Sequence, residues 1–312
     1  MSVIVITGCS TGIGYATAET LARNGHTVYA TMRNPKASPQ LDALTDADKL
    51  PITIFPMDVL DDESVKKVFD FVLADEGVID VLVNNAGISY VGAVEETSME
   101  FFKLVMDTNL YGTIRCIKAV LPSMRKRKSG TIINVSSVAG KLYGNFHGAY
   151  TASKAAVEAL SESLAQEVKP YNIQVAIVEP GVIETPIFDK VNGISENTKY
   201  PNVKRYLSFF AASLEAHNPP SAVAEVINEI VAGPNSKLRW PAGADALGLL
   251  DWRSSISDED WINSAGLSDE EWANNMEQMG LGVRKYLQAE GLPQLNAGER
   301  SKSRVGVSST SR

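Results

Sequence analysis

The first two dozen residues constrain the fold of this chain more than any other stretch. Val3 to Thr7 is a short apolar run rich in β-branched residues, as expected of a strand buried in a parallel sheet. A glycine-rich turn, Thr7-Gly8-Cys9-Ser10-Thr11-Gly12-Ile13-Gly14, follows, and a helical pattern then runs from Tyr15 to Asn24. Strand, glycine turn and helix in this order present backbone N–H groups and a helix N-terminus to a pyrophosphate. The opening therefore predicts a nucleotide-binding α/β fold.

Strands and helices continue to alternate along the first 185 residues. The further strands are expected at Thr27 to Met32, Ile52 to Met57, Val81 to Val83, Thr131 to Ser136, Gln174 to Val178 and about Leu238 to Trp240. Long helices are expected at about Ser98 to Lys128, Tyr150 to Lys169 and Ala222 to Val231. This order predicts a Rossmann-type, doubly wound parallel sheet of about seven strands flanked by helices.

Residues at the ends of two strands suit a bound dinucleotide. Arg33 follows the second strand, where an NAD site would carry an acidic residue, and a guanidinium there suits the 2′-phosphate of NADP. A solvated arginine at a strand end is the plain alternative. Asp58 could accept a hydrogen bond from an adenine amino group, or could cap the helix that starts at Asp61-Asp62-Glu63.

Two later turns suit the same cofactor. The fourth strand closes with Asn84-Asn85-Ala86-Gly87, whose small residues allow a ligand to approach closely. After the sixth strand, the Val182 backbone and the Thr185 hydroxyl are expected to meet a nicotinamide carboxamide. Both turns follow the carboxyl ends of expected strands, where ligands bind in sheets of this type.

Tyr150 and Lys154 are four residues apart, so they lie on the same face of the helix predicted there. An ammonium near a phenol stabilises the phenolate, and we expect Lys154 to lower the pKa of Tyr150 towards the working pH. Ser137, thirteen residues upstream, ends a strand and could hydrogen-bond a substrate oxygen beside the phenol. Ser136 is expected to pack beneath it. His147 is interpreted as a wall residue on the substrate side, or as simply exposed.

Composition excludes several classes of protein. The chain has 312 residues and a formal net charge of −8, so it lacks the positive field that nucleic acid requires. Its two cysteines, Cys9 and Cys116, lack metal-ligand spacing, and we expect them to be buried and the protein to be cytoplasmic. No metal site, signal peptide or membrane span is expected.

Because it carries these motifs in this order, the stretch 2–241 resembles the short-chain dehydrogenase/reductase family, most closely its hydroxysteroid and retinol dehydrogenase branch. The resemblance implies that Tyr150 exchanges a proton with the substrate, that Ser137 orients the substrate oxygen, and that Lys154 holds the nicotinamide ribose. It also implies that Asn109, in mid-helix, supports a water relay; an ordinary polar position is the alternative. The implied cofactor contacts are Gly8, Ser10, Thr11, Ile13, Arg33, Asp58, Val59, Asn85, Tyr150, Lys154, Val182 and Thr185.

The domain organisation follows from the same reading. Residues 1–241 are expected to form the catalytic domain, with a substrate lid at 186–218 in place of a plain surface excursion. We expect this lid segment to be less regular than the rest of the domain. Residues 242–297 are expected to form a helical extension and residues 298–312 a disordered tail. In relatives the helices near residues 100–125 and 152–168 form dimer interfaces, so a homodimer or homotetramer is expected; packing of both faces against the sheet is the alternative.

The function that follows is NADP(H)-dependent oxidation or reduction of a lipophilic, steroid- or retinoid-like alcohol or ketone, with NAD as the less suitable cofactor. Reduction of a 3-oxoacyl thioester or of general ketones is the alternative within the class. A catalytically idle NADP-binding regulator would be expected to have lost Tyr150, Lys154 or Ser137, and all three are present. An interaction module built on the tryptophan-bearing C-terminus could coexist with enzyme activity.

Overall fold

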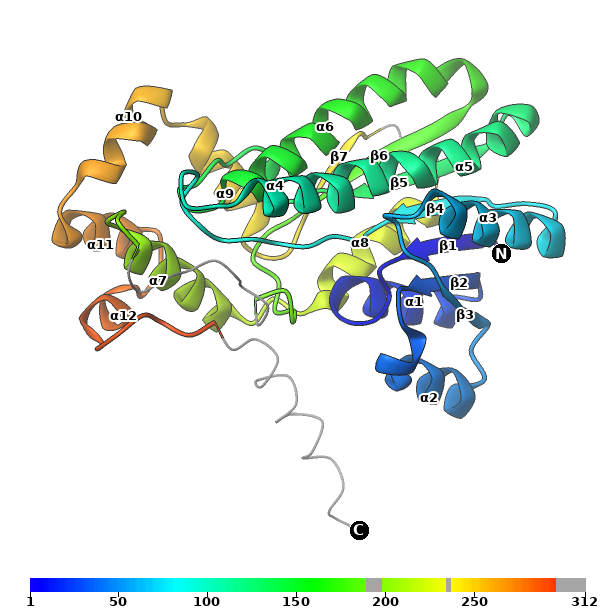
Figure 1. The fold of residues 1–312 in the computed structure, drawn as a ribbon, viewed down its shortest axis with the longest axis horizontal. Coiled ribbons are helices and arrows are strands. Elements are labelled where there is room, and N and C mark those ends of the chain that lie inside the picture. The colour runs from blue at the N-terminus through cyan, green and yellow to red at the C-terminus, as the bar shows by residue number, and fades with distance from the viewer. Residues whose placement is uncertain (189–197, 234–236, 296–312) are drawn as a thin grey trace, which may run out of the picture.

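The structure, a computed structural model, describes residues 1–188, 198–233 and 237–295 (Figure 1). Seven parallel strands form one sheet in the order β3-β2-β1-β4-β5-β6-β7. They are β1 Val3–Thr7, β2 Thr27–Met32, β3 Ile52–Pro56, β4 Val81–Asn84, β5 Gly130–Val135, β6 Ile173–Pro180 and β7 Arg239–Ala242. The order steps outward in both directions from β1 and β4, and ligands of doubly wound sheets bind at such a switch point. The predicted fold is confirmed.

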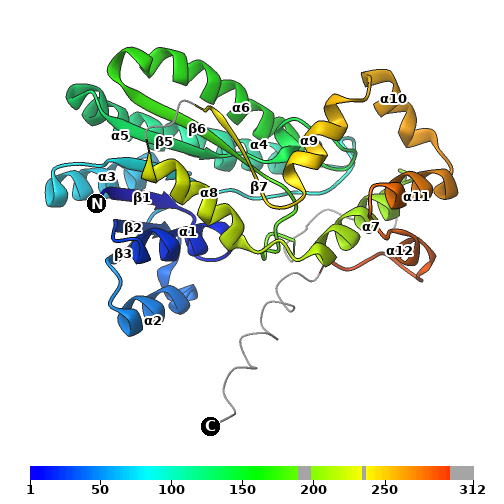
Figure 2. The ribbon, with the colours of Figure 1, turned by 180° about the vertical axis from the view of Figure 1, so that it is seen from behind.

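Helices cover both faces of the sheet, as Figures 1 and 2 show from opposite sides. One face carries α1 Gly12–Arg23, α2 Pro39–Asp48 and α8 Pro220–Ala232; the other carries α3 Asp62–Glu76, α4 Met99–Met106, α5 Gly112–Arg127 and α6 Gly148–Val168. Within the described ranges, no helix combines the length and the apolar character needed to cross a bilayer. α2 was not anticipated from the sequence, because Leu41 is the one side chain that it buries fully.

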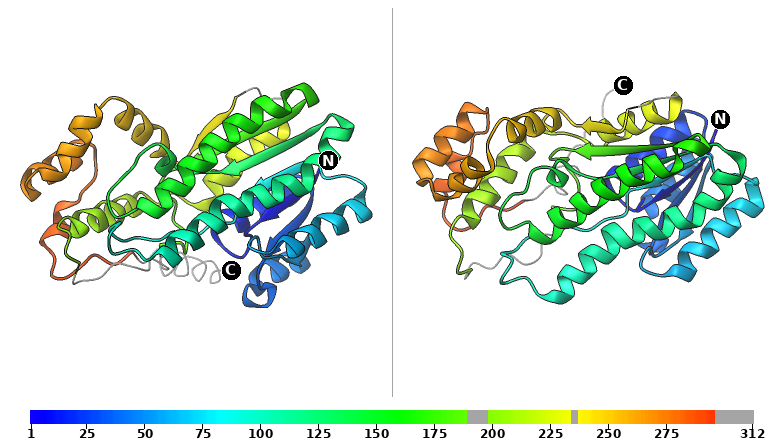
Figure 3. Two further views of the ribbon diagram at one scale, coloured as in Figure 1. Left: turned by 45° about the horizontal axis from the view of Figure 1, so that its top comes forward. Right: turned by 90° about the horizontal axis from the view of Figure 1, so that it is seen from above.

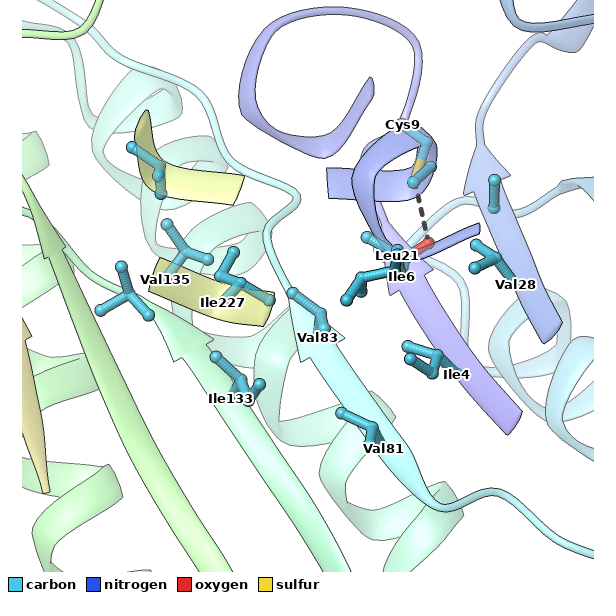
Figure 4. Packing of buried hydrophobic residues seen from close by; sticks show 14 of the residues in the cluster. Ile4, Ile6, Cys9, Leu21, Val28, Val81, Val83, Ile133, Val135 and Ile227 are labelled. Atoms are coloured by element: carbon cyan, nitrogen blue, oxygen red, sulfur yellow. Dashed lines mark hydrogen bonds between the residues drawn. The ribbon is translucent and has the colours of Figure 1, made fainter. Parts of the chain in front are cut away.

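Alternate residues of β1 pack into two hydrophobic cores, one on each face of the sheet. Ile4 and Ile6 pack with Leu21 of α1 and Ile227 of α8 (Figure 4), whereas Val3 and Val5 pack towards α3, α5 and α6. Two buried faces explain why the first four residues of β1, Val3 to Ile6, are all apolar.

The two cysteines are buried, as predicted, and they lie in different cores. The thiol of Cys9 donates to the Ile6 carbonyl at 3.3 Å (Figure 4). Burial raises the pKa of both thiols to about 12, so neither is a reactive thiolate at neutral pH.

A second group of helices lies beyond the carboxyl ends of the strands, at one end of the molecule (Figure 3). It consists of α7 Val203–Ser213, α10 Asp258–Asn263, α11 Asp269–Gln278 and α12 Arg284–Gln288, and α9 Ala246–Ser254 leads into it from β7. α7 corrects the expectation of an irregular segment at 186–218, because its apolar side chains pack on the C-terminal helices. Residues 189–197 of that segment and the tail from 296 onward lie outside the described residues.

Candidate active site

The glycine turn between β1 and α1 allows a ligand to approach the backbone closely. Gly8 and Gly12 have positive φ angles of 76° and 62°, which other residues rarely adopt. A Cβ on Gly14 would lie 2.4 Å from the Gly8 carbonyl oxygen, so this position also excludes a side chain. Thr11, the N-cap of α1, forms no side-chain cap. The first N–H groups of α1 are therefore open to phosphate oxygens.

Thr7 and Asn85 hold this turn in place. Thr7 Oγ1 accepts hydrogen bonds from the backbone N–H groups of Asn85 and Ala86, at 3.0 and 2.9 Å. Asn85 Nδ2 donates to the carbonyl oxygens of Thr7 and Gly8, at 2.9 and 3.2 Å. Sequence reasoning named Asn85 as a cofactor contact. Its side chain lines the cavity, but its amide nitrogen already supports the glycine turn.

Residues after β2 and β3 extend the same surface. Arg33 is exposed directly after β2 and lines the cavity together with Thr11. Asp61 caps α3 by accepting from the first turn, so the helix-capping alternative for Asp58 is wrong. The Asp58 carboxylate accepts from a backbone N–H at 3.0 Å and lines the cavity beside Val59. Glycine turn, guanidinium and carboxylate together fit an adenine dinucleotide.

Tyr150 and Lys154 lie on the first turns of α6, next to the end of β5. Lys154 is buried, and its Nζ donates to the Val135 carbonyl at 2.8 Å. The same Nζ lies 5.7 Å from the centroid of the Tyr150 ring. Ser137 Oγ accepts from the Ala139 N–H at 3.1 Å, and Ser137 also hydrogen-bonds Tyr150. Phenol, ammonium and hydroxyl thus meet at the carboxyl end of β5.

The predicted direction of the Tyr150 pKa shift is wrong for this structure. Burial raises the pKa of Tyr150 to about 12, and the hydrogen bond with Ser137 only partly opposes the rise. Burial also lowers the pKa of Lys154 to about 8, against the favourable charge of Glu158. Desolvation therefore outweighs the attraction on which the sequence-based expectation relied. At neutral pH the phenol keeps its proton and most Lys154 side chains remain charged.

Asn109 lies in a π-helical segment, Asp107–Tyr111, between α4 and α5. Its Oδ1 accepts from the Ile88 N–H at 2.9 Å, and its Nδ2 donates to the Ile88 carbonyl at 3.0 Å and to Ser153 Oγ at 2.9 Å. The side chain therefore ties the loop after β4 to the turn of α6 that carries Lys154. Alone among the predicted site residues, it does not line the cavity.

The two adjacent serines behave differently. Both line the cavity, and Ser137 hydrogen-bonds Tyr150. Ser136 is 2% exposed, and its hydroxyl has no hydrogen-bond partner within the described part of the chain. The Ser136 hydroxyl and the Glu158 side chain both lie close to Gly140: a Cβ placed on Gly140 would touch each of them.

The Val182 backbone has little capacity left for a ligand. Its N–H donates to Asp245 Oδ2 at 2.8 Å, and its carbonyl accepts from Asn218 Nδ2 at 3.3 Å. Ile183 also lines the cavity, and neither its N–H nor its carbonyl is hydrogen-bonded to the described residues. The Ile183 backbone is therefore freer than that of Val182 to meet a ligand, and the Val182 contact stays a prediction. Thr185 lies on the same turn and lines the cavity, as expected.

One cavity of about 1280 Å³ joins these groups. The predicted site residues that line it are Gly8, Ser10, Thr11, Ile13, Arg33, Asp58, Val59, Asn85, Ser137, Tyr150, Lys154, Val182 and Thr185. Phe210 of α7, within the segment predicted to be a substrate lid, lines the far wall of the cavity. Sequence reasoning missed the part of that wall formed by residues 249–279, which contribute Trp252, Trp261, Trp272 and Met276. The recurring tryptophans were the available signal. Among the described residues no group of three or more His, Cys, Asp or Glu could hold a metal ion.

Comparison with known proteins gives a consistent assignment. A profile of the family described as short chain dehydrogenase matches residues 2–194. The 3-ketodihydrosphingosine reductase of Bacteroides thetaiotaomicron is 38% identical over 248 residues, which cover 77% of this chain and 87% of the relative. Retinol dehydrogenase 8 of Bos taurus is 38% identical over 250 residues (76% and 80%). Human 17-beta-hydroxysteroid dehydrogenase type 1 is 34% identical over 253 residues (77% and 76%).

Solved structures agree with these relatives. A short-chain dehydrogenase from Streptomyces avermitilis has a TM-score of 0.74 at 34% identity, covering 89% of this chain and 97% of that chain. A metagenomic short-chain oxidoreductase in complex with NADP has a TM-score of 0.61 at 26% identity, covering 77% and 95%. The predicted resemblance to hydroxysteroid and retinol dehydrogenases is confirmed. The chain belongs to the short-chain dehydrogenase/reductase family and is an oxidoreductase of CH–OH and keto groups that uses a nicotinamide cofactor.

Proposed function

We propose that this protein is an NADP(H)-dependent oxidoreductase that acts on a lipophilic ketone or alcohol. The observation that carries the proposal is the continuity of one cavity. The glycine turn and Arg33 lie in one part of it, Tyr150 lies beside Ser137 and Lys154, and aromatic side chains wall the remainder. A phosphorylated dinucleotide and an apolar substrate can therefore meet at one phenol.

Tyr150 is the proposed proton donor during reduction and the acceptor during oxidation. The nicotinamide supplies or receives the hydride when bound. Ser137 Oγ hydrogen-bonds the same substrate oxygen and so fixes it at the phenol. The Lys154 charge stabilises the phenolate that remains after proton transfer to a carbonyl, and its ammonium holds the ribose hydroxyls. Asn109 is proposed to support the water relay that returns the proton, through its tie to the Ile88 carbonyl.

NADP is the proposed cofactor. Arg33 stands where an acidic residue would otherwise receive the ribose 2′-hydroxyl, and Thr11 lines the same part of the cavity. A structural neighbour is described in complex with NADP, which supports the proposal. NAD lacks the phosphate that would pair with the guanidinium, so we expect it to bind more weakly.

Cofactor binding to the purified protein tests this choice. NADPH is expected to bind at least about ten-fold more tightly than NADH, because a charge-assisted phosphate contact contributes more than an ordinary hydrogen bond. Arg33→Ala should remove the difference. Arg125→Ala is the matched control, because Arg125 is exposed and lies over the Tyr171 ring, away from the cavity. Equal binding of both cofactors to the unaltered protein would contradict the 2′-phosphate site.

A lipophilic substrate is supported by the cavity walls and by the relatives. Retinol, a hydroxysteroid and 3-ketodihydrosphingosine appear in the relatives' names, and each combines a reacting oxygen with an apolar body. We propose that residues 186–218, with α7 as their described part, form a lid on the domain 1–241, and that 242–297 complete the substrate wall. Turnover of a 3-oxoacyl thioester in preference to ketones would favour the alternative substrate class.

A homodimer or homotetramer in the reducing cytoplasm completes the proposal. Met99, Phe101, Leu104 and Tyr111 are exposed apolar side chains on α4 and the π-helical segment, which supports an interface there. Leu164 of α6 packs instead against the sheet and contributes nothing to that surface. Sedimentation at micromolar concentration tests the assembly, and a monomer would contradict it.

A further inference from the structure

Ser89 and His147 form a polar pair beside Tyr150 that the proposed reaction leaves unused. His147 Nε2 and Ser89 Oγ are 3.0 Å apart, and both residues line the cavity. The imidazole is 9% exposed and stacks on the Tyr150 phenol ring, with ring centroids 4.6 Å apart and an angle of 15° between the planes. The rings of Tyr206 and Phe210 meet it edge-on, at 5.7 and 6.0 Å between centroids. The stack corrects the alternative that His147 is simply exposed.

The backbone on both sides of the pair is held in place. Phe146, just before His147, has a φ of +58°, a left-handed conformation that is strained for an aromatic residue. Its carbonyl accepts from the Gly92 N–H at 2.8 Å, and its side chain is buried. Ser89 follows Ile88, whose N–H and carbonyl are both bonded to Asn109. Two loops are thus fixed so that a serine and a histidine meet beside the phenol.

The imidazole can hydrogen-bond but cannot act as an acid near neutral pH. Burial lowers the pKa of His147 to about 3, so the ring is neutral in the working range. Its other nitrogen, Nδ1, has no hydrogen-bond partner among the described residues. A serine hydroxyl can either donate or accept, so Nδ1 can carry the proton or the lone pair, as a bound group requires.

We propose that Ser89 and His147 recognise a hydroxyl or amino substituent on the carbon next to the reacting carbonyl. The inference rests on the proposed function, because it takes Tyr150 as the group that contacts the carbonyl oxygen. A substituent on the adjacent carbon lies about 3 Å from that oxygen, on standard bond lengths. The imidazole stacks on that phenol ring, with 4.6 Å between the ring centroids, and both rings line the cavity. The substrate is therefore a lipophilic ketone with a neighbouring hydrogen-bonding group, or the corresponding diol or amino alcohol.

Two ketones that differ by one hydroxyl test the proposal: decan-3-one and 2-hydroxydecan-3-one, each reduced with NADPH and with NADH. The unaltered enzyme is expected to prefer the hydroxyketone about ten-fold in kcat/KM, the factor that one good hydrogen bond gives. His147→Phe keeps a stacked ring and removes both nitrogens, so the preference should fall to about one, because the loss in kcat/KM is larger for the hydroxyketone than for decan-3-one. Ser89→Ala should reduce the preference by about three-fold. His26→Phe, a matched change outside the cavity, should leave it intact.

The outcomes separate this inference from the function on which it rests. If the unaltered enzyme reduces both ketones equally, recognition of the neighbouring substituent is wrong and the ketone reductase proposal stands. If neither ketone is reduced with either cofactor, the proposed function itself fails, and this inference fails with it. If His147→Phe and Ser89→Ala each lower kcat/KM by the same factor for both ketones, the pair only supports Tyr150 and does not recognise the substituent. If thermal unfolding shows that His147→Phe is not folded, the ratio of kcat/KM for the two ketones in Ser89→Ala decides.

Discussion

The two halves of the cavity are built by different means. The half around the glycine turn is formed by backbone groups at the ends of β1, β2 and β4, and glycines keep it open. The other half is formed largely by side chains of α7 and of residues 249–279, which lie outside the family match at 2–194, and Ser89 and His147 join them from inside it. Tyr150 lies where the two halves meet. The difference suggests that cofactor and substrate recognition can change independently, and the following predictions test that separation.

The largest expected effect is at the junction. Tyr150→Phe should lower kcat about a thousand-fold, because it removes the proton that the carbonyl oxygen must receive. NADPH affinity should stay within about two-fold, since the phenol hydroxyl is not part of the glycine turn. Steady-state kinetics and fluorescence titration measure the two quantities. Retention of near-full activity would show that another group donates the proton.

Asp245→Ala tests whether the halves are truly separate, because Asp245 precedes α9 and bonds the turn after β6. The change leaves the Val182 N–H and the Asn218 amide buried without their acceptor, so we expect a loss of about 2 kcal/mol of unfolding free energy. NADPH affinity should fall as well, by about three-fold or more. Asp251→Ala, an exposed aspartate on α9, is the control in urea unfolding. If Asp245→Ala left the NADPH affinity unchanged, the two halves of the cavity would be more independent than we expect.

Trp261→Ala should affect the substrate half alone. Trp261 donates to the Tyr143 carbonyl at 3.0 Å and packs edge-on against Trp252 at 5.2 Å, so its removal opens the apolar wall. We expect the KM of a lipophilic ketone to rise about ten-fold, from the lost apolar burial, with NADPH affinity unchanged. Leu247→Ala, on the exposed side of α9, is the control. A rise in the NADPH dissociation constant of Trp261→Ala would contradict the independence of the two halves.

A further prediction concerns the acid stability of the substrate half. The folded-state pKa of His147, about 3, lies below its ordinary value, so between pH 3 and about 6.5 the unfolded chain binds more protons. Stability due to this residue is present above that window and is lost as the pH falls through it. His147→Phe should therefore lose less stability between pH 7 and pH 4, measured by the urea midpoint.

The same division explains what the sequence could predict. β1 and β2 have the predicted bounds, because continuous apolar β-branched runs indicate buried parallel strands. The glycines after β1 predicted the nucleotide-binding turn, because a backbone without side chains lets a ligand approach closely. The hydrogen bond that occupies the Val182 N–H comes from Asp245, 63 residues further along the chain, so the sequence around Val182 could not show it. His147 and the tryptophans were visible as residues, but periodicity carries no information about which side chains meet across a cavity. Burial likewise reversed the expected pKa shift of Tyr150.

The π-helical segment at Asp107–Tyr111 has a consequence for how this chain tolerates insertions and deletions. A π-turn accommodates about one residue more than an α-turn, so deleting one residue there would restore a regular helix. Because the π-turn absorbs that one residue, α4 and α5 would keep nearly the same phase after the deletion. Buried Val105 and cavity-lining Leu104 would therefore stay on their present sides of α4. A single lost codon in this segment is thus tolerated by the preceding helix, whereas the same loss within α5 would rotate everything before it by about 100°.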